Sequence, residues 1–434
     1  MRNRVLLISI TTAILLNGCA QIPYIAGVQE GVTDPAETDA AATEQVTDGS
    51  GYESEIIVIN DYDNDDRDEM TEDVIGASEI HDNSIKPFDT SKEKSGSNLY
   101  AYQSLKDGME KDLYNEIYGI LSGFRSEVYM STLDTDIIDH AFSCVLIDHP
   151  ELFYVKGYSI KTYTRNGVAE KIAMSGSYIM DEEEIRDYLP KIDDYVKNCE
   201  ATIPFDADEY TRVKKVYEYI VRNTEYDKNA PNNQNIISVF VGKRSICQGY
   251  AKAMQYILND LGVFCTLVEG SVKEGEHHVW DLVKIDGKYY HVDPTWGDSP
   301  YNRVNRDSET GEITKQFAPS EINYDYLCIT TDEIKLTHEI VNPVPIPVCD
   351  SVDSNYYVRE GLYFSSIDEE ALEQAFIRAY NSKESSITIK CSDEMVYADM
   401  KYYLFDRQKV FKYLVDTSVN YAEIPGHNEI LIDL

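Results

Sequence analysis

The stretch EHHVWDLVKIDGKYYHVDPTW, residues 276–296, contains two runs of alternating apolar residues separated by Asp286-Gly287. Alternation of this kind is typical of β-strands, and Asp-Gly between two strands is the two-residue signal for a type I′ hairpin. The stretch therefore predicts an antiparallel hairpin in which Ile285 faces Lys288.

This predicted register sorts the three histidines of the hairpin. Because side chains alternate between the two faces of a sheet, His278 and His291 share a face with Asp293, whereas His277 points to the other face. Diagonal neighbours on adjacent strands are about 7 to 8 Å apart at the backbone, a gap that a histidine and an aspartate side chain can bridge. The hairpin leaves His278 and His291 as candidate partners of Asp293 and excludes His277.

A second segment, SICQGYAKAMQYILNDLG at residues 245–262, predicts a helix with a cysteine near its start. Cys247 falls in the first turn, where unpaired backbone N–H groups and the positive end of the helix dipole favour a thiolate, the reactive form of cysteine. A cysteine in this position is also a common small core residue, so the signal is weak alone. The predicted buried stripe of the helix consists of Tyr250, Met254, Ile257, Leu258 and Leu261.

Three motifs follow one another along this region: C-x-G-Y-A at Cys247, H-x-W-D at His278 and V-D-P-T-W at Asp293. Over residues 205–300 the chain resembles the transglutaminase-like superfamily. The resemblance implies an α+β fold with a papain-like core, in which a helix bearing the cysteine packs on an antiparallel sheet bearing the histidine and aspartate, with flanking α/β regions. It also implies a catalytic triad of nucleophile Cys247, base His278 and orienting acid Asp293.

Enzymes with such a triad form a thioester with a carbonyl substrate, and an amine or water then accepts the acyl group. The sequence does not separate acyl transfer on glutamine amides from the action of a cysteine peptidase or cell-wall amidase. A surface binding protein with an unused triad is a further alternative. Tyr226 is a candidate oxyanion donor beside the backbone N–H of Cys247. Trp280 and Trp296 flank the site and either wall an acyl channel or fill core.

The N-terminus predicts export. The basic MRNR is followed by VLLISITTAILL, an apolar run too short to span a bilayer comfortably. Leu16-Asn17-Gly18-Cys19 then resembles the lipobox of bacterial lipoproteins, whose cysteine carries the lipid. We therefore expect residues 1–18 to be a lipoprotein signal peptide and Cys19 to anchor the protein on the extracytoplasmic face of the cell membrane.

Residues 19–97 are predicted to be an acidic disordered tether, because Asp and Glu far outnumber Lys and Arg and apolar residues are sparse. Within it, residues 61–72 have acids at calcium-loop spacing but lack the glycine and the flanking helices that such a loop requires. The remaining predicted domains are an N-terminal α/β domain (98–200), the transglutaminase-like catalytic domain (201–340) and a small C-terminal α/β domain (341–434).

The net charge of −38 argues against a nucleic-acid partner, because phosphate binding needs clustered Lys and Arg. The expected partners are a protein or peptide substrate, cell-wall peptides included, and the membrane through the lipid. The sequence predicts no cofactor and no metal site. Seven cysteines remain beside Cys19, an odd and irregularly spaced set that predicts no disulfide framework.

Overall fold

The computed structural model describes residues 8–9, 46–47, 53–60, 99–106, 108–272, 275–298, 304–306, 313–316, 322–415, 418–424 and 427–434. The chain divides into two compact units. One consists of Met1–Ile22, Tyr290–Ile334 and Cys349–Leu434, and the other of Pro23–Tyr289 and Lys335–Val348. The division passes through strand β11 (Lys288–Val292), which is paired on both sides within one sheet. The predicted domain boundaries at 200 and 340 differ from these divisions and stay predictions.

The central sheet has the strand order β14-β11-β10-β9-β15. Within this sheet β10 pairs with β9, β15 with β9 and β11 with β14, all antiparallel. β10 ends at Ile285, β11 begins at Lys288, and both residues between them have positive φ, 50° at Asp286 and 79° at Gly287. Two positive φ angles are what a type I′ turn requires, so the predicted hairpin is confirmed. The other strands are β9 (Cys265–Val272), β10 (His277–Ile285), β14 (Leu327–Ile329) and β15 (His338–Ile340).

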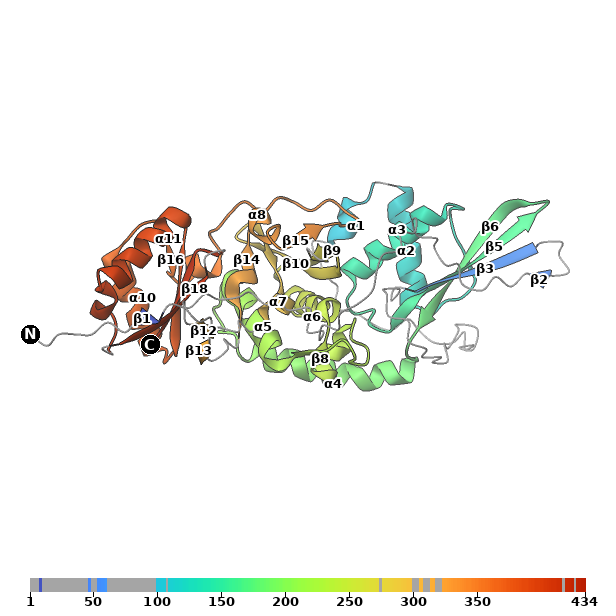
Figure 1. The fold of residues 1–434 in the computed structure, drawn as a ribbon. Helices are drawn as coiled ribbons and strands as arrows, with labels where there is room; N and C mark the ends of the chain where they lie inside the picture. Colours follow the sequence, from blue (N-terminus) through green and yellow to red (C-terminus); the bar gives the residue numbers. More distant parts are fainter. Residues whose placement is uncertain are drawn as a thin grey trace, which may run out of the picture. The chain divides into compact units, whose positions relative to one another are not determined.

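Helix α6 (Cys247–Asp260) packs against β9 and β10, and helix α5 (Glu209–Asn223) packs against α6 (Figure 1). Four of the five residues of the apolar stripe expected for α6, Tyr250, Met254, Ile257 and Leu258, are buried, which gives the helix one face toward the sheet; the fifth, Leu261, follows the last helical residue and is half-buried. Gly262 follows the helix with φ 75°, a conformation that glycine adopts at helix ends without strain. The helix and hairpin together form the mixed α+β core that the sequence predicts.

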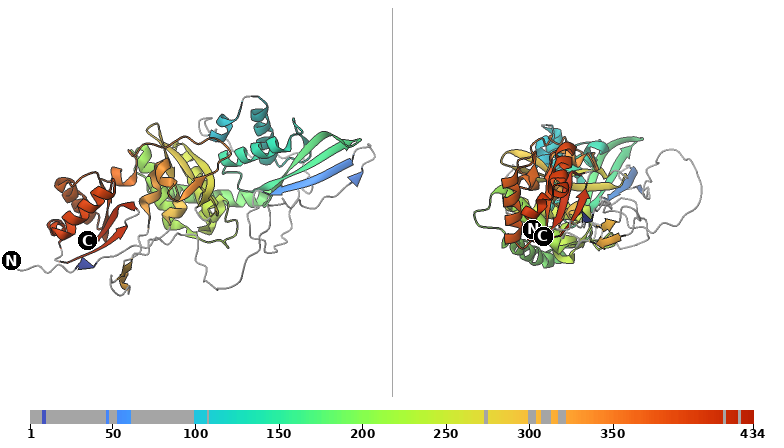
Figure 2. Two further views of the ribbon diagram at one scale, coloured as in Figure 1. Left: turned by 45° about the horizontal axis from the view of Figure 1, so that its top comes forward. Right: turned by 60° about the vertical axis from the view of Figure 1, so that its left-hand side comes forward.

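A second sheet lies in the same unit as α6 and has the order β2-β3-β5-β6-β4. Figure 2 shows its long strands β5 (Val155–Arg165) and β6 (Val168–Tyr178) side by side, with β3 (Glu53–Asn60) along β5. Strand β3 was not expected, because it lies within the segment predicted to be a tether. Most of residues 19–97 lies outside the described residues, and the tether stays a prediction. The neighbouring elements are β2 (Val46–Thr47), α1 (Tyr100–Ser104), α2 (Met109–Ser122), β4 (Val128–Tyr129), α3 (Thr135–Asp148) and α4 (Glu182–Glu200).

The C-terminal part of the chain has its own hydrophobic core around a sheet of order β1-β18-β19-β17-β16. Helix α10 (Glu369–Asn381) and strand β17 (Ser386–Cys391) contribute to this core. The other elements are β1 (Ile8–Ser9), β16 (Tyr363–Phe364), α11 (Glu394–Lys401), β18 (Val419–Ile424) and β19 (Glu429–Asp433). Shorter elements are β7 (Glu225–Tyr226), β8 (Arg244–Ser245), α7 (Pro294–Gly297), β12 (Val304–Arg306), β13 (Ile313–Gln316), α8 (Thr331–Ile334) and α9 (Tyr356–Arg359).

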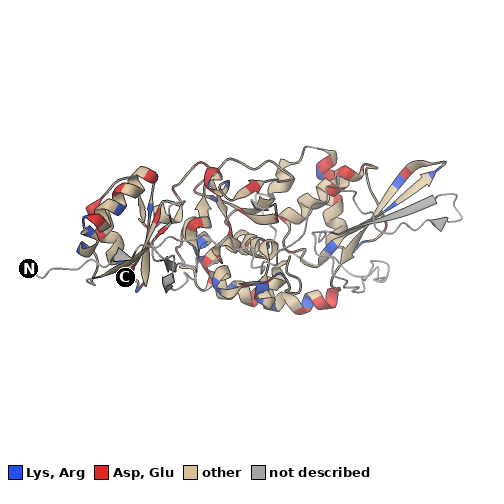
Figure 3. Cartoon of the chain, viewed as in Figure 1, with Lys and Arg blue, Asp and Glu red and all other residues tan. Residues whose placement is uncertain are grey.

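Acidic side chains gather at helix starts, as the first turn of α4 shows with Glu182–Glu184 (Figure 3). Carboxylates there accept from otherwise unpaired N–H groups and meet the positive end of the helix dipole. The same device caps α3, α5, α10 and α11, each through an aspartate side chain. Among the described helices, none has the length and apolar character needed to cross a membrane.

Candidate active site

Cys247 is the first residue of α6 and is largely buried. The residue before it, Ile246, is extended, and within the described part of the chain no side chain caps this helix. An aspartate cap here would compete with a cysteine thiolate for the same N–H groups and the same dipole. The start of α6, like that of α2, therefore lacks the aspartate cap of α3, α4, α5, α10 and α11, and this suits an anion formed on the helix itself.

The glycine of the C-x-G-Y-A motif has a steric reason. A Cβ on Gly249 would lie 2.0 Å from Ser245 Oγ and 2.7 Å from the carbonyl oxygen of Asn233. Ser245 Oγ donates to that same carbonyl at 2.8 Å and shares a 2.6 Å hydrogen bond with Ser238 Oγ. These bonds tie the segment before Cys247 to the loop 233–238, and only glycine leaves room for them.

Tyr226 is brought to the strand that leads into Cys247. β7 and β8 pair in parallel, and Tyr226 lies opposite Ser245 in that pairing. The backbone N–H of Asp227 also donates to the carbonyl of Ser245 at 2.8 Å. Tyr226 is half-buried, so its position near the start of α6 is compatible with the predicted oxyanion role.

The three histidines of the hairpin differ in burial and in partners. His278 is buried with 2% of its surface exposed, while His277 is exposed. His291 is also buried, and its Nε2 forms a 3.2 Å hydrogen bond with the Thr331 hydroxyl. That hydroxyl in turn accepts from the backbone N–H of Cys349 at 2.8 Å. Because its ring is used in this structural network, His291 is the weaker of the two candidate partners of Asp293.

Asp293 is fixed by the start of the short helix α7. Its Oδ1 accepts from the backbone N–H groups of Thr295 at 2.9 Å and Trp296 at 3.1 Å, and Pro294 occupies the first helical position. Aspartate as the cap and proline directly after it are the residues that favour a helix start. The D-P-T-W sequence thus holds a fully buried carboxylate in one orientation.

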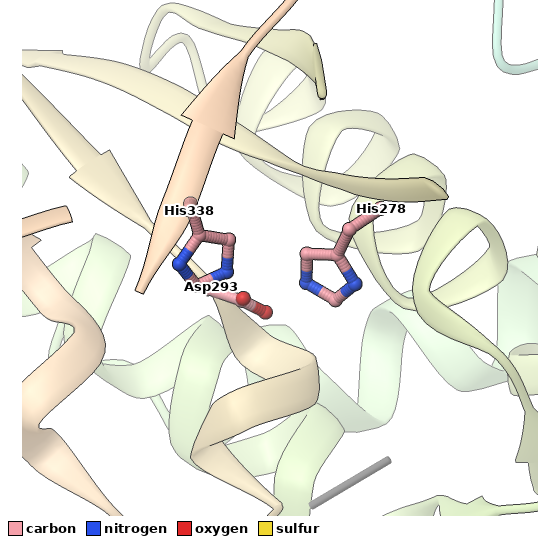
Figure 4. Close-up of side chains that lie close together, drawn as sticks. All are labelled: His278, Asp293 and His338. Atoms are coloured by element: carbon pink, nitrogen blue, oxygen red, sulfur yellow. The ribbon is translucent and has the colours of Figure 1, made fainter. Parts of the chain in front are cut away.

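Asp293 converges with two histidines, His278 and His338 (Figure 4). One side-chain N or O atom from each residue lies within 4.8 Å of those of the other two, and all three residues are buried. His338 comes from β15 and was not identified from the sequence. The position of His338 follows from the pairing of β15 with β9. β15 has three residues, which are too few to predict a strand from alternation.

The two tryptophans differ in their surroundings. Trp280 is fully buried, and its ring lies beside those of His278 (6.1 Å between centroids) and His338 (5.0 Å). Trp296 packs against Tyr326 at 4.9 Å. The complete burial of Trp280 favours core over channel wall for this residue.

The remaining predictions concern the other cysteines, the lipid anchor and the acidic segment. The seven described cysteines are buried and form no disulfide bonds with one another. Cys19 and the segment 61–72 lie outside the described residues, so the lipid anchor remains a prediction. Asp281 of the H-x-W-D motif was assigned no role from the sequence, and it accepts from Cys265 Sγ at 3.2 Å in the core.

A helix that begins with cysteine, packed on an antiparallel sheet with a buried histidine and aspartate, defines an α+β domain of the cysteine-protease type. Residues 199–294 match the family model of the transglutaminase-like superfamily. This part of the chain is a transglutaminase-like domain.

Several solved structures are similar to the chain. They include a crystal structure described as a TGase (20% identity, TM-score 0.25, covering 36% of this chain and 48% of that one). A candidate cysteine protease from Cytophaga hutchinsonii follows (13%, TM-score 0.23, 45% and 75%). The periplasmic domain of TgpA from Pseudomonas aeruginosa is a third (12%, TM-score 0.20, 33% and 73%). The chain thus spans about half the length of the TGase, and no curated protein matches it.

Proposed function

We propose that the chain is a transglutaminase-like cysteine enzyme that acts on peptide or glutamine amides. Cys247 is the nucleophile, His278 the base and Asp293 the residue that orients it. The observation that carries this proposal is the convergence of buried His278 and Asp293 in the sheet against which the cysteine-bearing helix packs.

In the first step, His278 takes the proton of the Cys247 thiol and the sulfur attacks the amide carbonyl carbon. The tetrahedral oxyanion is stabilised by N–H groups at the start of α6, with the Tyr226 hydroxyl as a further donor. His278 then gives its proton to the leaving nitrogen, and ammonia or an amine departs. The thioester that remains is attacked by an amine or by water, and His278 takes the proton of that acceptor. The C–S bond then breaks, the acyl product leaves, and the Cys247 sulfur recovers its proton from His278.

Transfer to an amine would make the protein a crosslinking enzyme, and transfer to water would make it a peptidase or cell-wall amidase. Incubation of the purified chain with casein and a labelled primary amine distinguishes these outcomes. Covalent labelling of casein supports transfer, and new N-termini without labelling support hydrolysis. Cys247→Ala is the control for both, and activity that persists in this variant would contradict the assigned nucleophile.

The three hairpin histidines offer a matched set of variants. We expect His278→Ala to abolish turnover and His277→Ala to retain most of it, because only the former is buried beside Asp293. His291→Gln tests the alternative base, and a loss equal to that of His278→Ala would contradict the assignment. If the unmodified protein neither labels nor cleaves any substrate, the alternative of a binding protein with an unused triad is favoured.

We also propose that the enzyme is held at the extracytoplasmic surface by lipid on Cys19. The support is the sequence alone: a basic start, an apolar run and a lipobox-like Leu16–Cys19. Metabolic labelling with a fatty acid in a bacterial host tests this proposal. Label that is equally present in Cys19→Ser would argue against it.

A further inference from the structure

We propose that His278, Asp293 and His338 form a binding site for a divalent transition metal ion of the zinc class. Two imidazole nitrogens and one carboxylate oxygen are a donor set that zinc uses in proteins with three protein ligands and one open position. Neither a metal nor a role for His338 was expected from the sequence. The inference rests on the position of His338, which the triad chemistry does not use.

The geometry needs little adjustment to hold an ion. The three donor atoms already lie within 4.8 Å of one another. Zinc–ligand bonds of about 2.0–2.2 Å place tetrahedral ligand atoms roughly 3.3–3.6 Å apart. Side-chain rotations that move the donor atoms by about 1 Å would bring them to these distances. Asp293 is buried, and a buried negative charge favours a cation beside it.

His338 also has the outer partner that metal-ligating histidines have. Its Nδ1 forms a 2.8 Å hydrogen bond with the Thr337 hydroxyl, which holds the orientation of the ring. Outer-shell bonds of this kind raise the affinity for the metal.

A bound ion would stop the chemistry that the proposed function assigns to this site, and this part of the inference rests on that function. With a metal ion on one ring nitrogen and a hydrogen on the other, the His278 ring has no nitrogen left to accept the proton of Cys247. Occupancy would therefore act as a reversible off state. Metal binding itself requires neither the cysteine nor turnover.

A second group of metal-type side chains in the described residues must be separated from this site. Asp325, His427 and Glu429 also present donor atoms within 4.8 Å of one another. However, the ammonium of Lys390 lies 2.8 Å from Glu429 Oε1. A fixed positive charge beside the group opposes a second cation, so we infer no metal there.

The test uses the full chain with Cys247→Ala, since a thiolate would bind metal by itself. After treatment with EDTA and desalting, the protein is titrated with Co²⁺, read by its visible absorption, and with Zn²⁺, read by calorimetry. We expect one ion per chain. Adding His338→Gln should weaken binding at least tenfold, and adding Thr337→Val about tenfold. Adding His427→Gln or His291→Gln should leave binding unchanged.

Each outcome decides the question. No Co²⁺ absorption in Cys247→Ala, or binding lost in His427→Gln and kept in His338→Gln, overturns the proposal. Thr337→Val keeps the test valid if His338→Gln does not fold, as judged by circular dichroism. In the enzyme with Cys247, Zn²⁺ should inhibit labelling of casein, and His338→Gln should raise the inhibitory concentration at least tenfold. If the metal binds but does not inhibit labelling, the metal site stands and the proposal that the bound ion switches the enzyme off is wrong.

Discussion

The imidazole rings of His278 and His338 lie 5.1 Å apart, although strand β9 runs between their two strands. Gly270 of β9 makes this approach possible, since it pairs with His278 on one side and with Ile340 on the other. Having no side chain, it leaves space over β9 for the histidine rings and for Trp280. A Cβ at this position would lie 2.9 Å from the Trp280 ring and 2.0 Å from the carbonyl oxygen of Glu339.

We expect Gly270→Ala to destabilise the protein by about 1–3 kcal/mol, the usual cost of overpacking a core, and to lower activity. The matched control is Gly119→Ala in helix α2, where a Cβ would meet nothing within 4 Å. That change should raise stability by roughly 0.5–1 kcal/mol, because alanine is the better helix former. Urea unfolding followed by circular dichroism measures both. Equal effects from the two substitutions would contradict the steric role of Gly270.

Gly249→Ala should reduce turnover by moving Cys247. The added methyl group would displace Ser245 Oγ or the backbone of Asn233, which hold the chain just before the cysteine. We expect the rate constant of thiol alkylation at Cys247 to change together with the catalytic rate. A variant with a displaced melting temperature and an unchanged alkylation rate would show that Gly249 serves stability alone.

Replacing Asp293 by asparagine or by alanine should separate its two tasks. Asparagine keeps an oxygen that can cap α7 but lacks the charge that orients and stabilises a protonated histidine. We expect Asp293→Asn to retain stability and to lose activity on the order of 100-fold or more. Asp293→Ala should lose that activity and in addition about 1 kcal/mol of stability. Full activity in Asp293→Asn would exclude a role for the carboxylate charge in catalysis.

Iodoacetamide near neutral pH should label Cys247 before any other described cysteine. Burial raises the pKa of the other six thiols: to about 11 at Cys349, to about 12 at Cys144, Cys199 and Cys391, and well above the ordinary value at Cys265 and Cys328. Cys247 instead begins a helix whose first turn has no side-chain cap. Peptide mass spectrometry gives the order of labelling. Slow labelling at Cys247, unaffected by His278→Ala, would contradict an activated nucleophile.

The buried group around Glu429 should make the C-terminal sheet less stable as pH rises from 5 to 8. Burial and the charge of Asp325 raise the pKa of Glu429 from 4.5 to about 7. At His427 burial lowers the pKa, but the hydrogen bond and charge of Asp325 outweigh it, so this pKa is raised above 6.5. A raised folded-state pKa contributes stability below the unfolded value, and that stability is lost as pH rises through the folded value.

The carboxylate of Asp325 titrates in a different window. Burial raises its pKa, yet the bond to His427 and the charge of Lys390 hold it well below its usual range, so its contribution is lost only in acid. Hydrogen exchange of residues 386–391 and 429–433, corrected for intrinsic rates, should therefore show weaker protection at pH 8 than at pH 5.5. Glu429→Gln should reduce the difference. Protection that increases with pH in both proteins would contradict the assigned shifts.

Local sequence patterns predict much of the α+β core. Alternating residues and Asp286-Gly287 predict the hairpin, and helical spacing predicts α6 with Cys247 in its first turn; both match the structure. The cap of α5 is less readily predicted: Asp206 and Asp208 both precede the helix, and it is Asp208 that accepts from the Thr211 N–H at 2.8 Å. Both are aspartates just before the helix, and which one caps it depends on the exact first turn.

The sequence by itself determined the elements that depend on neighbours along the chain, and it placed His278 and His277 on opposite faces of the sheet, because side-chain direction follows from a period of two residues. The tertiary structure alone decided what depends on strands that are distant in sequence. It joined β15 to β9 and so brought His338 to Asp293, and it gave His291 its partner in Thr331. Pairing between distant segments depends on packing of the whole sheet, which no local periodicity encodes.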